Sequence, residues 1–244
     1  MPVNFSIIKN IVQFIFLIAI FPGSALYGKT PVYFEVISIK PGKQDTLKED
    51  QILYNGRLWR NLYSSVKGDQ FFLSSEFLYG SVTINKKKFS NIRIRYDDYN
   101  DELITLSNLG NLLQLNKEMV DSFTLDFKGR TYHFANFQAD SVKGLQGYLN
   151  VLVNGKSSLY VKYKKEIASL AVDNKYDMFF QTHKMYIVKD DVVYNISGKR
   201  DFLNMADDYK VQIRSYIKKN RLKVSKKDPE TFVPLVRFYN SLMQ

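Results

Sequence analysis

The sequence predicts a mainly β protein of the α+β type, in which an antiparallel sheet precedes a C-terminal pair of amphipathic helices. Apolar and polar residues alternate over most of residues 30–197, as expected of strands with one buried face. Turn-forming residues separate these runs at short intervals, which favours a meander, a sandwich or an open barrel. From residue 198 the apolar residues recur at steps of three and four instead, as in helices.

Residues 1–28 have the pattern of a secretory signal peptide. Lys9 lies in a short, otherwise uncharged head, an apolar run follows over residues 11–21, and small residues come after it. The apolar run is shorter than the ~20 residues that cross a bilayer, which favours a cleaved signal over an uncleaved anchor. We expect cleavage after Ala25 or Gly28, no transmembrane segment in the mature chain, and a secreted protein of the cell envelope.

The region 30–197 is expected to form the β domain. Its alternating runs predict strands at 32–37, 81–85, 92–97, 122–127, 132–137, 149–153 and 160–163. Asn55-Gly56 and Asn154-Gly155 are the strongest turn signals, because Asn and Gly tolerate the positive φ of tight hairpins. Further turn signals lie at Lys67-Gly68-Asp69, Tyr79-Gly80, Asn85-Lys86-Lys87, Lys128-Gly129 and Lys189-Asp190-Asp191.

Residues 198–244 are expected to form two helices that pack on the β domain. One apolar stripe consists of Phe202, Ala206, Tyr209, Ile213, Tyr216 and Ile217. The second helix begins at Asp228-Pro229-Glu230, where Asp228 caps and Pro229 takes the first helical position. Its apolar stripe consists of Phe232, Leu235, Val236, Tyr239 and Leu242.

The composition limits the kinds of protein that the chain represents. It has no cysteine, so no disulfide stabilises the fold and no thioether-linked lipid anchors it. Removal of residues 1–28 removes one basic and no acidic residue, which lowers the formal net charge from +11 to +10. The 17 tyrosines and 18 phenylalanines favour a sheet, because aromatic side chains suit half-buried pleated surfaces.

The acidic cluster Asp97, Asp98, Asp101 and Glu102 is the strongest candidate site. Dense oxygen ligands in a short loop suit calcium, but the spacing does not match an EF-hand, and a solvated turn between two strands is the favoured interpretation. The same carboxylates are the nearest candidates for a hydrolase that uses two acidic groups. We assign no catalytic residue, cofactor-binding residue or cofactor from the sequence.

Other catalytic patterns are missing from the sequence. His133 and His183 lack the H-E-x-x-H spacing of many zinc sites and are expected to be ordinary side chains. No Gly-x-Ser-x-Gly elbow and no phosphate-binding glycine loop occurs.

Lysines gather in four places, at 86–88, 162–165, 218–221 and 223–227. In an envelope these lysines would attract anionic lipid or glycan. Because export separates the protein from nucleic acid, nucleic acid is not expected as a partner. The alternative, which we favour, is that the lysines keep sheet edges soluble.

Several segments also carry a family likeness. They are Leu53-Tyr54-Asn55-Gly56-Arg57, residues 66–71, Gly80-Ser81-Val82-Thr83, Tyr96-Asp97, 101–104, 161–165, 186–189, Lys199-Arg200-Asp201 and 238–242. Together they resemble a family of uncharacterised exported proteins from Bacteroidota. The resemblance implies the envelope of a diderm bacterium, either the periplasm or the outer membrane, and carries no activity with it.

These observations predict a non-enzymatic cell-envelope protein that binds another protein, a surface glycan or a lipid through a sheet face or groove. One alternative is a carboxylate-dependent hydrolase that acts on an envelope polymer. The other is a structural subunit of an outer-membrane assembly.

Overall fold

The computed structural model describes residues 51–138, 144–169 and 177–243. The chain divides into two compact units, Met1–Pro41 and Gly42–Gln244, and all described residues belong to the second. The predicted signal peptide, both expected cleavage positions and the strand predicted at 32–37 lie outside the described residues.

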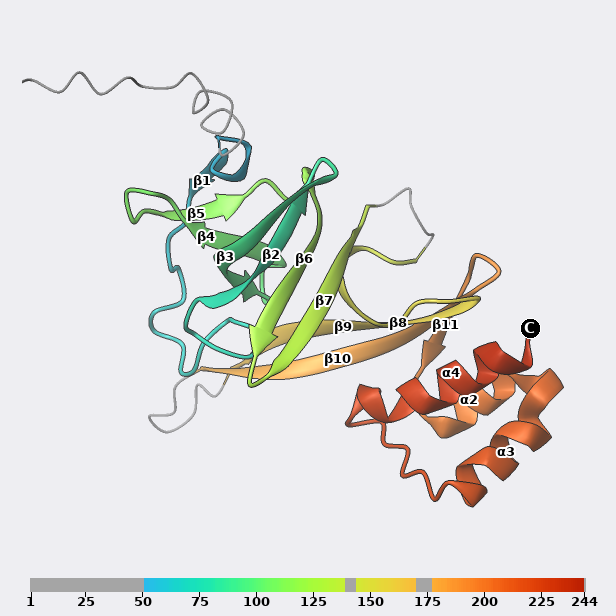
Figure 1. The fold of residues 1–244 in the computed structure, drawn as a ribbon. Helices are drawn as coiled ribbons and strands as arrows, with labels where there is room; N and C mark the ends of the chain where they lie inside the picture. Colours follow the sequence, from blue (N-terminus) through green and yellow to red (C-terminus); the bar gives the residue numbers. More distant parts are fainter. Residues whose placement is uncertain (1–50, 139–143, 170–176, 244) are drawn as a thin grey trace, which may run out of the picture. The chain divides into compact units, whose positions relative to one another are not determined.

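Eleven strands form one antiparallel sheet in the described part of the chain (Figure 1). They are β1 (Gly56–Leu58), β2 (Leu78–Ile84), β3 (Lys87–Asp97), β4 (Glu102–Leu106), β5 (Leu112–Leu115), β6 (Val120–Phe127), β7 (Arg130–Phe137), β8 (Gly147–Val153), β9 (Ser157–Ala168), β10 (Met178–Lys189) and β11 (Val192–Ile196). Their order in the open sheet is β1-β5-β4-β3-β2-β6-β7-β8-β9-β10-β11. The predicted fold class is therefore confirmed.

The predicted turn at Asn154-Gly155 lies in the short connection between β8 and β9. The turns with positive φ lie at other predicted signals. Positive φ angles occur at Asn85 and Lys86, at Lys128 and Gly129, and at Asp190 and Asp191, which join β2–β3, β6–β7 and β10–β11. The predicted reason for the two Asn-Gly signals was wrong, because neither Gly56 nor Gly155 is among the glycines with positive φ.

The glycines at the predicted turns that lack a positive φ instead allow neighbouring atoms to approach the backbone closely. A Cβ on Gly155 would lie 2.7 Å from Nδ2 of Asn240. The turn predicted at Tyr79-Gly80 was also wrong: Gly80 lies inside β2, next to a register shift, where a Cβ would lie 1.9 Å from the carbonyl oxygen of Thr124. A glycine in the sequence can therefore indicate either a turn or a strand that another backbone approaches closely, and only the residues around it in space distinguish the two.

Residues 66–72, which we call the closing segment, connect distant strands of the sheet. Phe71 pairs with Asp97 at the end of β3, and Lys67 pairs with Met178 at the start of β10. The backbone N–H of Lys165 in β9 also donates to the carbonyl of Asp98 over 3.2 Å. The closing segment thus brings the end of β3 to the neighbouring strands β9 and β10, although β3 is adjacent to neither of them in the sheet order.

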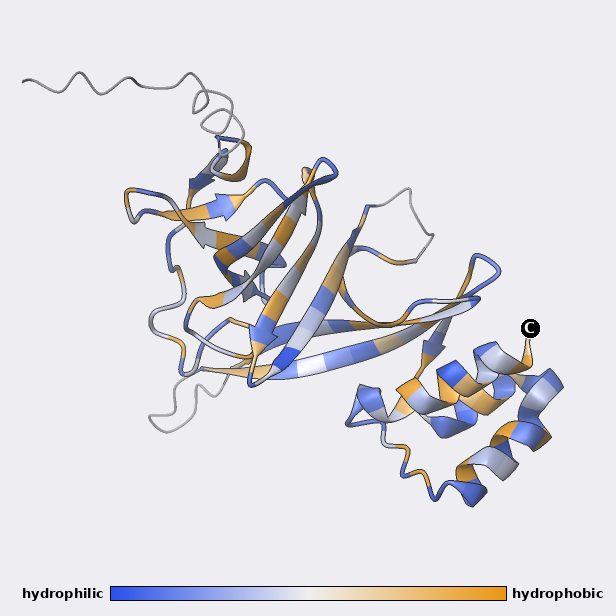
Figure 2. Cartoon of the chain, in the orientation of Figure 1, coloured by the Kyte–Doolittle hydropathy of each residue, from blue (hydrophilic) through white to orange (hydrophobic). Residues whose placement is uncertain are grey.

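Two apolar cores stabilise the fold. Figure 2 shows how hydrophobic and hydrophilic residues are distributed along the strands and helices that build them. The first is rich in aromatic side chains from the sheet and the closing segment, and its central rings are Phe72, Tyr96, Phe123, Phe134 and Tyr148. The rings of Phe123 and Phe134 stack with their centroids 4.7 Å apart. Such contacts add to the hydrophobic gain of burying large side chains.

The second core joins the helices to the sheet. The helical elements are α2 (Lys199–Met205), the 3-10 turn η1 (Asp207–Tyr209), α3 (Lys210–Lys219), the 3-10 turn η2 (Pro229–Phe232) and α4 (Val233–Leu242). Their apolar residues pack with those of β8 to β11. Asp228 caps η2 as predicted, accepting the N–H of Glu230 over 3.2 Å.

The first predicted helix is interrupted at Ala206, where ψ is 41°. This break separates α2 from η1 and α3, and it lets Phe202 and Ile213 pack into the same core. The longest helices that the structure describes have 10 residues, and none has the length and apolar character required to span a bilayer.

Candidate functional site

Asp97, at the end of β3, organises the turn that leads to β4. It is fully buried, and Oδ1 of its carboxylate accepts the backbone N–H groups of Tyr99 and Asn100 over 3.1 and 2.9 Å. Oδ2 accepts the side-chain amides of Asn100 and Gln70 over 2.9 and 2.7 Å. Burial raises the pKa of Asp97, while these hydrogen bonds oppose the rise. Asp97 therefore has a structural role in the turn.

Asp98 lies where the closing segment meets β9 and β10. Its side chain is buried, and Oδ2 accepts a hydrogen bond from Gln181 over 3.1 Å, whereas Oδ1 has no hydrogen-bond partner. Burial raises the pKa of Asp98 to about 8, although the positive charge of Lys165 acts in the opposite direction. Asp98 is thus a carboxyl group whose neutral form is favoured near neutral pH.

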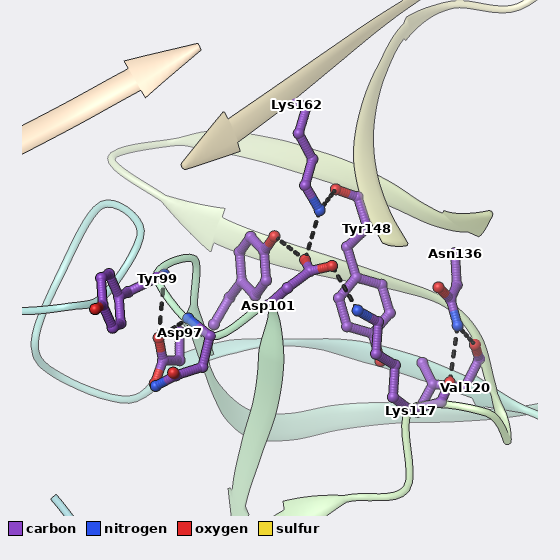
Figure 3. A network of polar contacts seen from close by, with 10 residues as sticks. Asp97, Tyr99, Asp101, Lys117, Val120, Asn136, Tyr148 and Lys162 are labelled. Atoms are coloured by element: carbon purple, nitrogen blue, oxygen red, sulfur yellow. Dashed lines mark hydrogen bonds and ion pairs between the residues drawn. The ribbon is translucent and has the colours of Figure 1, made fainter. Parts of the chain in front are cut away.

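Asp101 lies at the centre of a charged network (Figure 3). Its carboxylate accepts the hydroxyl of Tyr96 over 2.6 Å and the ammonium groups of Lys117 and Lys162 over 2.5 and 2.7 Å. Burial alone would raise the pKa of Asp101, but the two lysines lower it below its ordinary value. Gly147 leaves room for the network, because a Cβ there would lie 1.9 Å from Oδ2 of Asp101.

The turn that carries Lys117 is fixed separately. Nδ2 of Asn136 donates to the carbonyls of Lys117 and Val120 over 2.7 and 2.8 Å (Figure 3). Asn136 therefore holds the backbone of Lys117 through contacts that do not involve the ion pair between Lys117 and Asp101.

Glu102 points to a different set of partners. Arg57 contacts it over 3.3 Å and donates from Nε to Gln114 over 2.7 Å. Burial raises the pKa of Glu102, and the charge of Asp97 adds to the rise. Asp97, Asp98, Asp101 and Glu102 are thus close in sequence but bind separate partners, and the described residues contain no set of three or more acidic, His or Cys side chains placed to hold a metal ion.

Two adjoining hollows lie beside this turn, and we call them together the Arg57 groove. The larger has a volume of about 550 Å³ and the smaller about 360 Å³. Both are lined by Arg57, Asn100, Glu102 and Gln114. The larger adds Asp101 with the amides of Asn55 and Asn116, and the smaller adds Trp59 and Tyr63.

Sequence patterns identified only the acidic part of this groove. Trp59, Tyr63 and Gln114 lie far from Asp101 in the sequence and belong to no motif, although Trp59 is the single tryptophan of the chain. Tyr63 donates from its hydroxyl to Asn100 over 3.4 Å, and its ring meets that of Tyr99 edge-on at 4.9 Å.

The other predicted candidates lie elsewhere. His133 is exposed on β7, and Nε2 of His183 lies 2.9 Å from the carbonyl oxygen of Lys226. In the lysine cluster 162–165, Lys162 binds Asp101 and Lys165 binds the carbonyl of Asp69 over 2.9 Å. Both serve internal contacts, so this cluster is not a free basic patch.

Comparisons with protein-family models, curated proteins and solved structures found no match for this chain. The resemblance to exported proteins of Bacteroidota stays a prediction.

Proposed function

We propose that this protein is a non-enzymatic protein of the cell envelope, located in the periplasm or at the outer membrane, and that it binds a glycan in the Arg57 groove. The observation that carries the proposal is the lining of the groove. Amides and a carboxylate at Asn100, Glu102 and Gln114 lie beside the aromatic rings of Trp59 and Tyr63.

This combination suits the chemistry of a sugar. Each sugar hydroxyl donates and accepts hydrogen bonds. An amide side chain offers a donor and an acceptor in one plane, and an ionised carboxylate adds two acceptor oxygens. The C–H faces of a sugar ring pack against aromatic side chains, which combine an apolar face with a polar tip.

The polar groups of the groove are held in place without a ligand. Arg57 is bound by both Gln114 and Glu102, and the hydroxyl of Tyr63 is bound to Asn100. Groups that are ordered in advance lose less conformational freedom when a ligand binds, which favours affinity. The export signal predicted at residues 1–28 supports a location where glycans are abundant.

Titration calorimetry with soluble oligosaccharides from peptidoglycan and from lipopolysaccharide tests the proposal. We expect saturable binding of one class, weakened about tenfold by Gln114→Ala, because a lost hydrogen bond in a site is worth about 1 kcal/mol or more. Gln212→Ala, at an exposed position of α3, is the matched control and should bind as the unmodified protein does. The proposal is contradicted if the protein binds neither class of oligosaccharide, or if both substitutions weaken binding equally.

A carboxylate-dependent hydrolase is the second candidate, and one observation favours it. Asp101 and Glu102 line the same hollow, and their pKa values shift in opposite directions. Glycosidases use such a pair, one carboxyl protonated and one ionised. We rank binding first because Asp101 already accepts three donors, which reduces its ability to attack a sugar carbon or activate water.

The two functions are distinguished by incubating the protein with the same oligosaccharides and measuring new reducing ends. The binding function predicts none. Release that disappears in Glu102→Gln and persists in Glu166→Gln, a substitution on β9 outside the groove, would establish the hydrolase instead.

A further inference from the structure

The helical tail carries a further hollow, of about 760 Å³, lined by residues of α2 and α3. Five of its lining residues are basic, and none is acidic. They are Lys199, Arg200, Lys210, Arg214 and Lys218. Leu203 and Ile217 supply its apolar part, and both belong to or pack against the second core. We call this hollow the basic groove.

Three basic side chains of α3 lie on one face of the helix, where their mutual repulsion destabilises it. Lys210, Arg214 and Lys218 follow one another at steps of four residues and therefore lie on one face. Like charges at this spacing repel each other and destabilise a helix. Among the described residues, Lys210 pairs with Asp207 over 3.0 Å, whereas no ion pair contains Arg214 or Lys218. An anion in the groove would remove this repulsion.

We propose that the basic groove binds the phosphate headgroup of an anionic lipid at a membrane surface. Lys and Arg clusters on amphipathic helices attract anionic lipid headgroups, and Arg binds phosphate oxygens in pairs. Leu203 and Ile217 provide an apolar surface for the first carbons of the lipid, which a free inorganic anion does not need. No aromatic residue lines the groove, so it lacks the stacking surface that single-stranded nucleic acid requires.

This inference concerns a different part of the chain from the Arg57 groove and does not depend on glycan binding. It assigns the helical tail a role in recruiting the protein to a membrane surface. The rest of the chain would then be concentrated near the polymers of that surface.

Vesicle co-sedimentation with the full mature chain tests the inference. The probes are vesicles of phosphatidylcholine alone and vesicles that also contain phosphatidylglycerol. We expect binding to the anionic vesicles only, weakened about 25-fold by the double substitution Arg214→Gln/Lys218→Gln, since each cation near the surface contributes roughly a fivefold change. Lys223→Gln/Lys226→Gln changes the net charge equally at exposed positions outside the groove and should weaken binding far less.

Three results would overturn the inference. Equal weakening by the two double variants would show attraction by net charge alone. Displacement from the vesicles by millimolar inorganic phosphate would show a site for the free anion. Tighter binding to a short DNA duplex than to the anionic vesicles, abolished by Arg214→Gln/Lys218→Gln, would show a nucleic-acid site.

Discussion

The side-chain amide of Asn240 pairs with the backbone of Ser157 as a neighbouring strand would. Ser157 N–H donates to Oδ1 of Asn240, and Nδ2 of Asn240 donates to the carbonyl of Ser157, each over 2.8 Å. The two residues are 83 positions apart, and Ser157 is fully buried. This pair connects α4 to the first residue of β9 and is supported by the second core around it.

Asn240→Ala is expected to lower the free energy of unfolding by about 1–3 kcal/mol, because it leaves two buried backbone groups of Ser157 without partners. Urea denaturation measures the change. Asn204→Ala, at an exposed position of α2, is the control and should cost far less. Similar losses in both variants would show that the amide pair contributes nothing specific.

Gly147→Ala is expected to disrupt the network around Asp101. Gly147 has a φ of +76°, and its added Cβ would overlap the carboxylate of Asp101. Gly129→Ala is a close control, since Gly129 has a φ of +75° but nothing within 4 Å of an added Cβ. Both substitutions place a side chain in the same strained backbone conformation, so that cost is shared. Thermal unfolding should therefore show a larger loss of stability for Gly147→Ala, by about 1 kcal/mol, because this variant also disturbs the partly buried ion pairs of Asp101. Equal losses would mean that the network does not depend on the missing side chain.

Asp98→Asn is expected to change how stability depends on pH. The pKa of Asp98 is about 8 in the folded protein, above its ordinary value of 3.8. Between these values the folded protein keeps a proton that the unfolded chain has released, so this group makes stability fall as the pH rises through the range. Asn cannot titrate, and the variant should gain stability relative to the unmodified protein between pH 5 and pH 9 by at least about 1.4 kcal/mol, the equivalent of one pKa unit.

Denaturation at several pH values measures this difference, with Asp190→Asn in the exposed β10–β11 turn as the control. The groups that face Asp98 are Lys165, Asp97 and Asp69. A constant difference between Asp98→Asn and the unmodified protein at all pH values would refute the raised pKa.

The native protein is expected to begin at Leu26 or Lys29, after removal of the export signal. Mass spectrometry of the protein from its own organism measures this directly. Detection of Met1 in the mature protein would instead remove the main support for a location in the envelope.

The alternation of residues predicted strands at β2, β3, β6, β7, β8 and within β9, but no alternating run was assigned to β1, β4, β5, β10 or β11. It failed at the end of β3, where Asp97 occupies a polar position of the pattern but is fully buried. The reason is the closing segment, which covers that position and has no periodicity of its own. Alternation of polar and apolar residues predicts which side chains are buried only where no other segment packs on the polar face of the strand.

The Arg57 groove was beyond sequence patterns for a topological reason. Its members come together because β1 pairs with β5, and β5 pairs with β4, which places Arg57 and Gln114 beside Glu102. Which strands pair across such long stretches of sequence depends on the arrangement of the whole sheet. Alternation within each strand gives no information about which strand lies next to it.

The closing segment also bears on how the sheet comes apart. It hydrogen-bonds to the ends of β3 and β10, so neither strand end can detach without releasing the other. Contacts between such distant parts of the chain slow folding, because a long loop must close before they form. Once formed, they make the loss of either end a concerted event, and the two halves of the meander should melt as one cooperative unit.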